Sequence, residues 1–84
     1  MLYYLFQCRS LTYAQKTKAA LERAGISGYL QRSPRSISGE GCSHSVKVSQ
    51  RNLTAALKVL HRAGIDPVRV YMTQGDGSYR EVML

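Results

Sequence analysis

The chain has 84 residues, 44% of them hydrophobic, with two cysteines and a formal net charge of +7. This length suits one domain whose core is just large enough to fold unaided, and two cysteines are too few for a secreted disulfide framework. No apolar segment approaches the roughly 20 residues of a membrane span, and the N-terminus lacks the features of a signal peptide. We therefore expect one cytoplasmic domain over residues 1–84, with no membrane partner and no bound cofactor.

The first half of the chain predicts a strand, a helix and a second strand. An apolar run over 2–8 is typical of a buried strand. Thr12-Tyr13-Ala14-Gln15 fits a capping box and predicts a helix over 12–24. A strand over 26–32 follows the glycine that ends this helix. The helix has one buried face, expected to comprise Ala14, Thr17, Leu21 and Ala24.

The second half repeats this order. Alternation over 43–48 predicts a half-buried strand, and Ser49 is placed to cap a helix over 50–63. A fourth strand is expected over 67–73, which completes a unit from 43 to 73. In the tail, 74–84, a glycine-rich turn predicts that 79–83 pairs back as an edge strand. The apolar stripe of the second helix is expected to comprise Leu53, Ala56, Leu57 and Leu60.

The sequence contains an internal repeat. Arg23-Ala24-Gly25-Ile26 recurs 39 residues later as Arg62-Ala63-Gly64-Ile65. Each copy follows a helical pattern, and its glycine is placed where only glycine takes a left-handed cap without strain. Two such strand–helix–strand units in tandem predict an α+β, ferredoxin-like βαββαβ sandwich. The expected strand order is 4-1-3-2, with a possible fifth strand at an edge.

Cys42 is the candidate working residue. It ends a polar loop, 33–42, that contains glycine and arginine, and a thiol near positive charge can be held as the reactive thiolate. In the predicted fold, Cys8 at the end of the first strand lies beside the start of the third, where the first helix also begins. Helix N-termini favour anions. Groups expected to stabilise a thiolate or bound anion are Arg9, Arg35, Ser36, Ser38, Gly39 and Gly41.

Each candidate also has a simpler interpretation. Cys42 can be an incidental surface thiol, and Cys8 can be either a small core residue or a partner thiol. His44 lies two residues beyond Cys42 on the same strand face, where it is either a base or an amphipathic surface residue. A metal site is not expected, because the chain has no Cys-x-x-Cys pair or dense histidine cluster.

The pattern resembles a known family. Tyr3-Tyr4-Leu5-Phe6, Ala24-Gly25-Ile26, the Pro34-Arg35-Ser36-Ile37-Ser38 stretch leading to Cys42, and Ala63-Gly64-Ile65 are similar to the small bacterial DUF3343 proteins. These are described as selenium/sulfur carrier-like, and the resemblance runs from about Leu2 to Tyr71. The family typically reaches Cys-Gly after a shorter serine-rich run. Here Gly39-Glu40-Gly41 precedes the thiol and Ser43 follows it.

The resemblance implies a carrier rather than a stand-alone enzyme, with sulfur- or selenium-donor and acceptor proteins as partners. An alternative is a non-catalytic interaction domain. Its open sheet face, with Tyr3, Leu5 and Tyr71 as the apolar patch, is then buried by a second copy or by the tail strand. A third is a basic nucleic-acid-binding module. RNA-binding domains of this fold stack bases on aromatics of both central strands, and the third strand has none, which disfavours that function.

Overall fold

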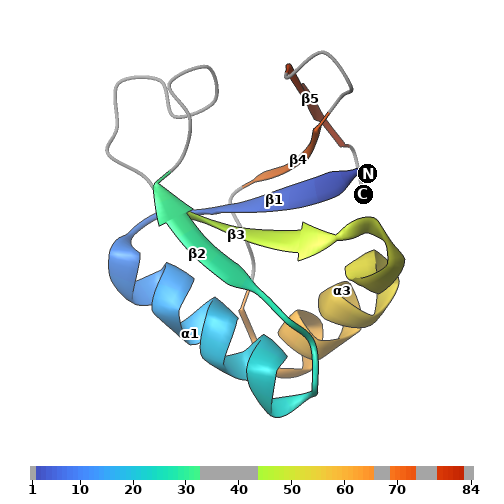
Figure 1. Cartoon of the computed structure of the whole chain (residues 1–84). Coiled ribbons are helices and arrows are strands. Elements are labelled where there is room, and N and C mark those ends of the chain that lie inside the picture. The colour runs from blue at the N-terminus through green and yellow to red at the C-terminus, as the bar shows by residue number, and fades with distance from the viewer. Residues whose placement is uncertain (1, 33–43, 66–68, 74–77, 83–84) are drawn as a thin grey trace.

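A computed structural model describes residues 2–32, 44–65, 69–73 and 78–82. Within these ranges the chain alternates strands with two α-helices and one 3-10 helix (Figure 1). In chain order the elements are β1 (Tyr3–Cys8), α1 (Leu11–Arg23), β2 (Tyr29–Arg32), β3 (His44–Ser49), η1 (Gln50–Asn52), α3 (Leu53–Arg62), β4 (Arg69–Thr73) and β5 (Tyr79–Glu81).

The described strands form one antiparallel sheet in the order β2-β3-β1-β4-β5. This confirms the predicted α+β class with two helices and an antiparallel sheet. The strict four-stranded order 4-1-3-2 does not describe the whole sheet, because β5 pairs with β4 and extends that edge by a fifth strand.

Both helices cover the same face of the sheet, as Figure 1 shows. Between them and the sheet lies a core in which Phe6, Leu21 and Val46 are fully buried. Leu60 of α3 is 1% exposed and completes the same cluster. Burying one such side chain fully contributes about 1.5–3 kcal/mol to stability. This core therefore holds the two helices against the sheet.

The two repeated segments end their helices in the same way. Gly25 and Gly64 adopt φ angles of 81° and 71°, the left-handed conformation predicted for them. The amide of Ile26 then donates to the Leu21 carbonyl, and the amide of Ile65 donates to the Leu60 carbonyl, each at 2.9 Å. These bonds satisfy carbonyls that a helix end would otherwise leave unpaired. They also use the Ile26 amide, which is why the second strand begins at Tyr29 and not at residue 26 as predicted.

The predicted helix starts were wrong in detail. The N-cap of α1 is Ser10, whose hydroxyl accepts a hydrogen bond from the Tyr13 amide at 3.2 Å, so Thr12 lies inside the helix. Ser49 precedes η1 and makes no side-chain capping bond, and α3 itself begins only at Leu53. The second helical segment is therefore split between a short 3-10 turn and an α-helix.

The sequence predicted that a second copy or the tail strand covers the sheet face opposite the helices. Leu5 and Tyr71 pair across β1 and β4 on this face, and they are only 1% and 8% exposed. Nearby, the Lys47 ammonium lies 4.2 Å from the centre of the Tyr3 ring. Leu5 and Tyr71 therefore offer little free apolar surface to a second copy, and dimerisation through this face stays a prediction.

Candidate functional site

The end of β1, the end of β2 and the start of β3 lie together at one end of the sheet, close to the start of α1. The antiparallel register places His44, the first residue of β3, opposite both Cys8 and Arg32. Helix α1 begins at Leu11, three residues after Cys8. The predicted meeting of the end of β1 with the start of β3 is therefore present, although the residue opposite Cys8 is His44. The remaining predicted site residues lie outside the described part of the chain: Arg35, Ser36, Ser38, Gly39, Gly41 and Cys42.

Cys8 is buried beneath α1. Its side chain is 3% exposed, and its Sγ lies 3.6 Å from the Thr17 hydroxyl and 3.5 Å from the Phe6 carbonyl oxygen. Thr17 is fully buried and donates its hydroxyl proton to the Tyr13 carbonyl at 2.8 Å. The Cys8 thiol therefore has the Phe6 carbonyl and the Thr17 hydroxyl oxygens beside it as acceptors. The Thr17 hydroxyl proton is already bonded to Tyr13.

This environment favours the neutral thiol at Cys8. Burial raises the pKa of the Cys8 thiol. A thiolate is the nucleophilic form of cysteine, and ionising Cys8 would place a charge in an apolar layer without a cation. The surroundings of Cys8 are those of a core residue.

The first turn of α1 carries an exposed aromatic and cationic group. The Arg9 guanidinium lies 5.1 Å from the centre of the Tyr13 ring, and the Lys16 ammonium lies 5.7 Å from it on the same helix. Arg9 is exposed and Tyr13 is 36% exposed. Arg9 thus adds positive charge outside the N-terminus of α1 and not beside the buried sulfur of Cys8.

His44 has an unused polar atom. Its ring is half-buried, and its Nδ1 atom is buried with no hydrogen-bond partner among the described residues. An imidazole nitrogen either donates or accepts a hydrogen bond, depending on its protonation. His44 consequently has hydrogen-bonding capacity left for a group outside the described ranges.

Sequence reasoning missed two features of this end. Thr17 was expected on the buried helix face, but its contact with Cys8 was not foreseen, since nine residues separate them in the chain. Arg32 was not singled out, although its pairing with His44 fixes the two ends between which residues 33–43 lie. The strand register carried that information, and the sequence pattern predicted strands without their register.

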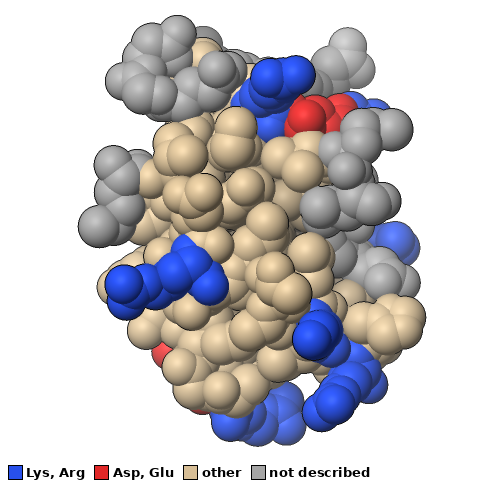
Figure 2. Space-filling view, turned by 90° about the vertical axis from the view of Figure 1, so that its right-hand side faces the viewer, with Lys and Arg blue, Asp and Glu red and all other residues tan. Residues whose placement is uncertain are grey.

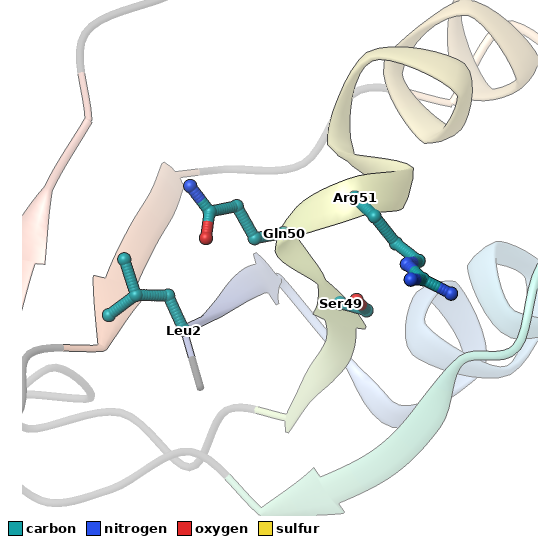
Figure 3. A pocket seen from close by; sticks show the side chains of 4 residues that line it. All are labelled: Leu2, Ser49, Gln50 and Arg51. Atoms are coloured by element: carbon teal, nitrogen blue, oxygen red, sulfur yellow. The ribbon is translucent and has the colours of Figure 1, made fainter.

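A hollow of about 480 Å³ lies at the opposite end of the sheet, lined by Leu2, Ser49, Gln50 and Arg51 (Figure 3). Figure 3 shows the Gln50 and Arg51 side chains directed to opposite sides. Tyr3 pairs with Ser49 there, five residues from Cys8 along β1, which corresponds to roughly 17 Å of strand. The four lining residues include no thiol or imidazole, so this hollow is not the thiol site.

Within the described ranges, no group of three His, Cys, Asp or Glu side chains comes together as a metal site would require. Cys8 and His44 are neighbours, but two ligands fall short of the three or four that hold a zinc ion. Neither α1 nor α3, the α-helices that the structure describes, is long and apolar enough to cross a membrane.

Comparison with known families gives one finding. A family model described as "Putative Se/S carrier protein-like" matches residues 3–72. The match starts at β1 and ends in β4, so it includes both strand–helix–strand units and the segment that contains Arg35 and Cys42. The resemblance noted in the sequence is thereby confirmed. No curated protein and no solved structure matches the chain.

Proposed function

The chain belongs to the family of Se/S carrier protein-like proteins, and on that premise we propose that it carries sulfur or selenium as a persulfide-type adduct on Cys42. The observation that carries this proposal is the family match across 3–72, which includes Cys42, combined with the burial of Cys8. Of the two cysteines, Cys8 is enclosed under α1 and lacks the surroundings of a nucleophile. Cys42 is left as the thiol that can meet a partner.

The position of His44 in the sheet supports this assignment. Within the sheet, β4-β1-β3-β2 follows the ferredoxin-like order, which brings the end of β1 beside the start of β3. Cys42 precedes His44 by two residues, and two residues of chain span at most about 7 Å. The proposal therefore requires Cys42 to act close to His44 and the start of α1, a distance that this length of chain allows.

The proposed loading step needs no outside oxidant or reductant. The Cys42 thiolate attacks the terminal sulfur of a persulfide on a donor protein, and a new sulfur–sulfur bond forms at Cys42 Sγ. The bond between that terminal sulfur and the donor cysteine breaks, and the donor leaves as a thiolate. Delivery to an acceptor is the same exchange in which Cys42 is the leaving group. A selenium atom would transfer by the corresponding exchange.

The neighbouring groups would supply charge and hydrogen bonds. Arg35 and Arg9 are positioned in the sequence to favour the thiolate or a charged adduct. The Nδ1 atom of His44, which has no hydrogen-bond partner among the described residues, can bond to the adduct or hold a proton. Ser36 and Ser38 offer hydroxyl donors, and Gly39 and Gly41 let the backbone approach a ligand closely. Donor and acceptor proteins in a reducing cytoplasm are the partners that this proposal requires.

The test is to load the protein and weigh it intact. A cysteine desulfurase with free cysteine should add one sulfur atom to the wild-type chain, and dithiothreitol should remove it. Cys42→Ser should abolish the gain, while Cys8→Ser, the matched control, should keep it. The proposal fails if the wild-type chain gains no reducible sulfur while a known carrier in the same reaction does. It fails equally if Cys42→Ser is loaded as well as the wild type.

A further inference from the structure

A shallow groove runs between α1 and α3 on the side of the helices that faces away from the sheet. It consists of two adjoining hollows of about 360 and 520 Å³, both lined by Ala20, Arg23 and Ala63. Small and aliphatic side chains form its floor, with Ala24 and Val59 beside them. These small side chains leave apolar surface open between the two helices.

The rim of the groove is positively charged. Lys16 and Arg23 of α1 and Arg62 of α3 are exposed and line the hollows. Figure 2 shows several Lys and Arg side chains gathered at the lower end of the molecule, the helical layer of Figure 1. The groove thus combines a mostly aliphatic floor with a positively charged rim.

The carboxylates of the described residues do not neutralise that rim. Glu22 pairs with Lys18 at 3.4 Å, and Glu81 pairs with Arg69 at 3.6 Å. Asp66 follows Ile65 in the sequence and lies outside the described ranges. Even if it is counted, the three cations of the rim outnumber it.

Compensation of the helix dipoles does not account for all of this charge. Arg23 and Arg62 stand in the last turns of their helices, where a cation is favourable. Lys16 lies in the middle of α1, outside the reach of that effect. In addition, amides of Gly25, Ile26, Gly64 and Ile65 already satisfy carbonyls at the two helix ends. No carboxylate of the described residues pairs with the rim, so its cations are available to an external anion.

We propose that this groove docks an acidic amphipathic helix of a partner protein, an inference that does not depend on Cys42 carrying sulfur. A helix laid between two packed helices contacts both of them, and its apolar stripe would lie on the alanine floor. Its Glu and Asp side chains would face Lys16, Arg23 and Arg62. An acidic peptide fits better than nucleic acid, because the floor is mostly aliphatic. Among the described lining residues Tyr13 is the one aromatic, and its ring already lies beside the Arg9 and Lys16 cations.

The groove also points toward the thiol end of the molecule. Tyr13, in the first turn of α1, lines the wider hollow, and Arg23 lines it ten residues later. Ten helical residues span about 15 Å. A partner helix in the groove would therefore extend along α1 to the end at which Cys8 and His44 stand.

Fluorescence anisotropy with designed probes tests the proposal. The probe is a labelled 18-residue peptide with leucine and alanine on one helical face and glutamate on the other. A scrambled peptide of equal composition and a single-stranded oligothymidine serve as comparisons. We expect the amphipathic peptide to bind at least about tenfold more tightly than its scrambled version, since only it matches floor and rim together.

Charge-reversal variants localise the binding. Arg23→Glu combined with Arg62→Glu should weaken peptide binding by about tenfold or more. The double variant Arg51→Glu with Arg80→Glu changes the net charge equally at exposed positions away from the groove and should weaken it by less than about twofold. Ala63→Trp, which fills the floor without changing charge, should also weaken binding and serves if the first double variant fails to fold by circular dichroism.

Three results would overturn the proposal. The first is equal affinity for the amphipathic and scrambled peptides. The second is an equal loss in the two charge-reversal double variants, which would show attraction by net charge alone. The third is binding of the oligothymidine, lost in the groove variants, with no binding of the amphipathic peptide, which would make the groove a nucleic-acid site.

Discussion

The two halves of the molecule agree at one end of their helices and differ at the other. Residues 39 apart correspond, and at the helix C-termini the match is close: Leu21 and Leu60 are buried, and Gly25 and Gly64 share a left-handed conformation. At the N-termini, Ser10 caps α1 through its side chain, whereas Ser49 makes no such bond and α3 is preceded by η1. The left-handed glycine after the helix thus occurs in both halves, whereas the serine side-chain cap before the helix occurs in the first half.

The difference identifies where chemistry is expected. Thr17 of α1 corresponds to Ala56 of α3, and both side chains are fully buried. In the first half this position holds a hydroxyl in contact with Cys8, and in the second half it holds only a methyl group. The polar groups, the thiol and the capped helix start are thus all in the first half, at the end where His44 begins β3.

The largest effects should come from the matched leucines. Leu21→Ala and Leu60→Ala each remove a fully buried side chain from the same core, at 0% and 1% exposure. We expect each to lower the free energy of unfolding by about 3 kcal/mol. Urea denaturation of both variants measures it. A cost at one site less than half that at the other would show that the two halves are not equivalent even at their helix ends.

The two glycines should cost less, and equally. A Cβ atom added at Gly25 or Gly64 would meet no atom of the described residues within 4 Å, so backbone strain is what opposes alanine there. We expect Gly25→Ala and Gly64→Ala each to destabilise the protein by about 1 kcal/mol, measured from urea midpoints. Gly28→Ala is a contrasting control, because its Cβ would lie 3.0 Å from Val46 Cγ1 and has to displace that side chain.

The two serines should differ, which sharpens the comparison. Ser10→Ala removes a side-chain cap and should cost about 1 kcal/mol, whereas Ser49→Ala should cost close to zero. Thermal unfolding of the two variants decides this directly. Equal losses would contradict the assignment of the polar helix start to the first half alone.

The smallest effect is a pH dependence at Cys8. Burial raises the pKa of this thiol in the folded state, so as pH rises above about 8.5 the unfolded chain loses its proton first. The stability that Cys8 contributes is therefore complete below that pH and declines above it. The difference in unfolding free energy between wild type and Cys8→Ala should shrink between pH 7 and pH 10. A difference that stays constant or grows would mean that Cys8 ionises readily in the fold.

Much of the fold was predictable because local patterns specified it. The repeated glycines gave the ends of both helices, and the alternating residues of 43–48 gave β3. Boundaries were less predictable where one group had two possible partners. The amide of Ile26 could have joined the sheet, but it bonds to Leu21 and shortens β2. Both Ser10 and Thr12 are suitable caps by residue type, and only the position of the chain leaving β1 selects Ser10.

The candidate site was less predictable, because it depends on strand register and packing. The sequence placed Cys8 and the start of the third strand at one end of the sheet. It did not predict that Thr17 contacts Cys8 or that His44 is the residue opposite it. The sequence, in which β1 is apolar on both faces, left open whether a second copy or the tail strand covers Leu5 and Tyr71. The described residues show that both side chains are buried.

The central claim is that Cys42 is the reactive thiol and Cys8 is a buried core residue. Site-resolved alkylation across a pH series tests it most directly. Iodoacetamide labelling of the folded wild-type protein, followed by peptide mass spectrometry, gives a separate rate for each cysteine. We predict that Cys42 reacts with an apparent pKa below the free-thiol value of about 8.5 and that Cys8 stays unlabelled until urea is added. Labelling of folded Cys8 at a rate comparable to Cys42, or a Cys42 pKa at or above that of a free thiol, would contradict the account.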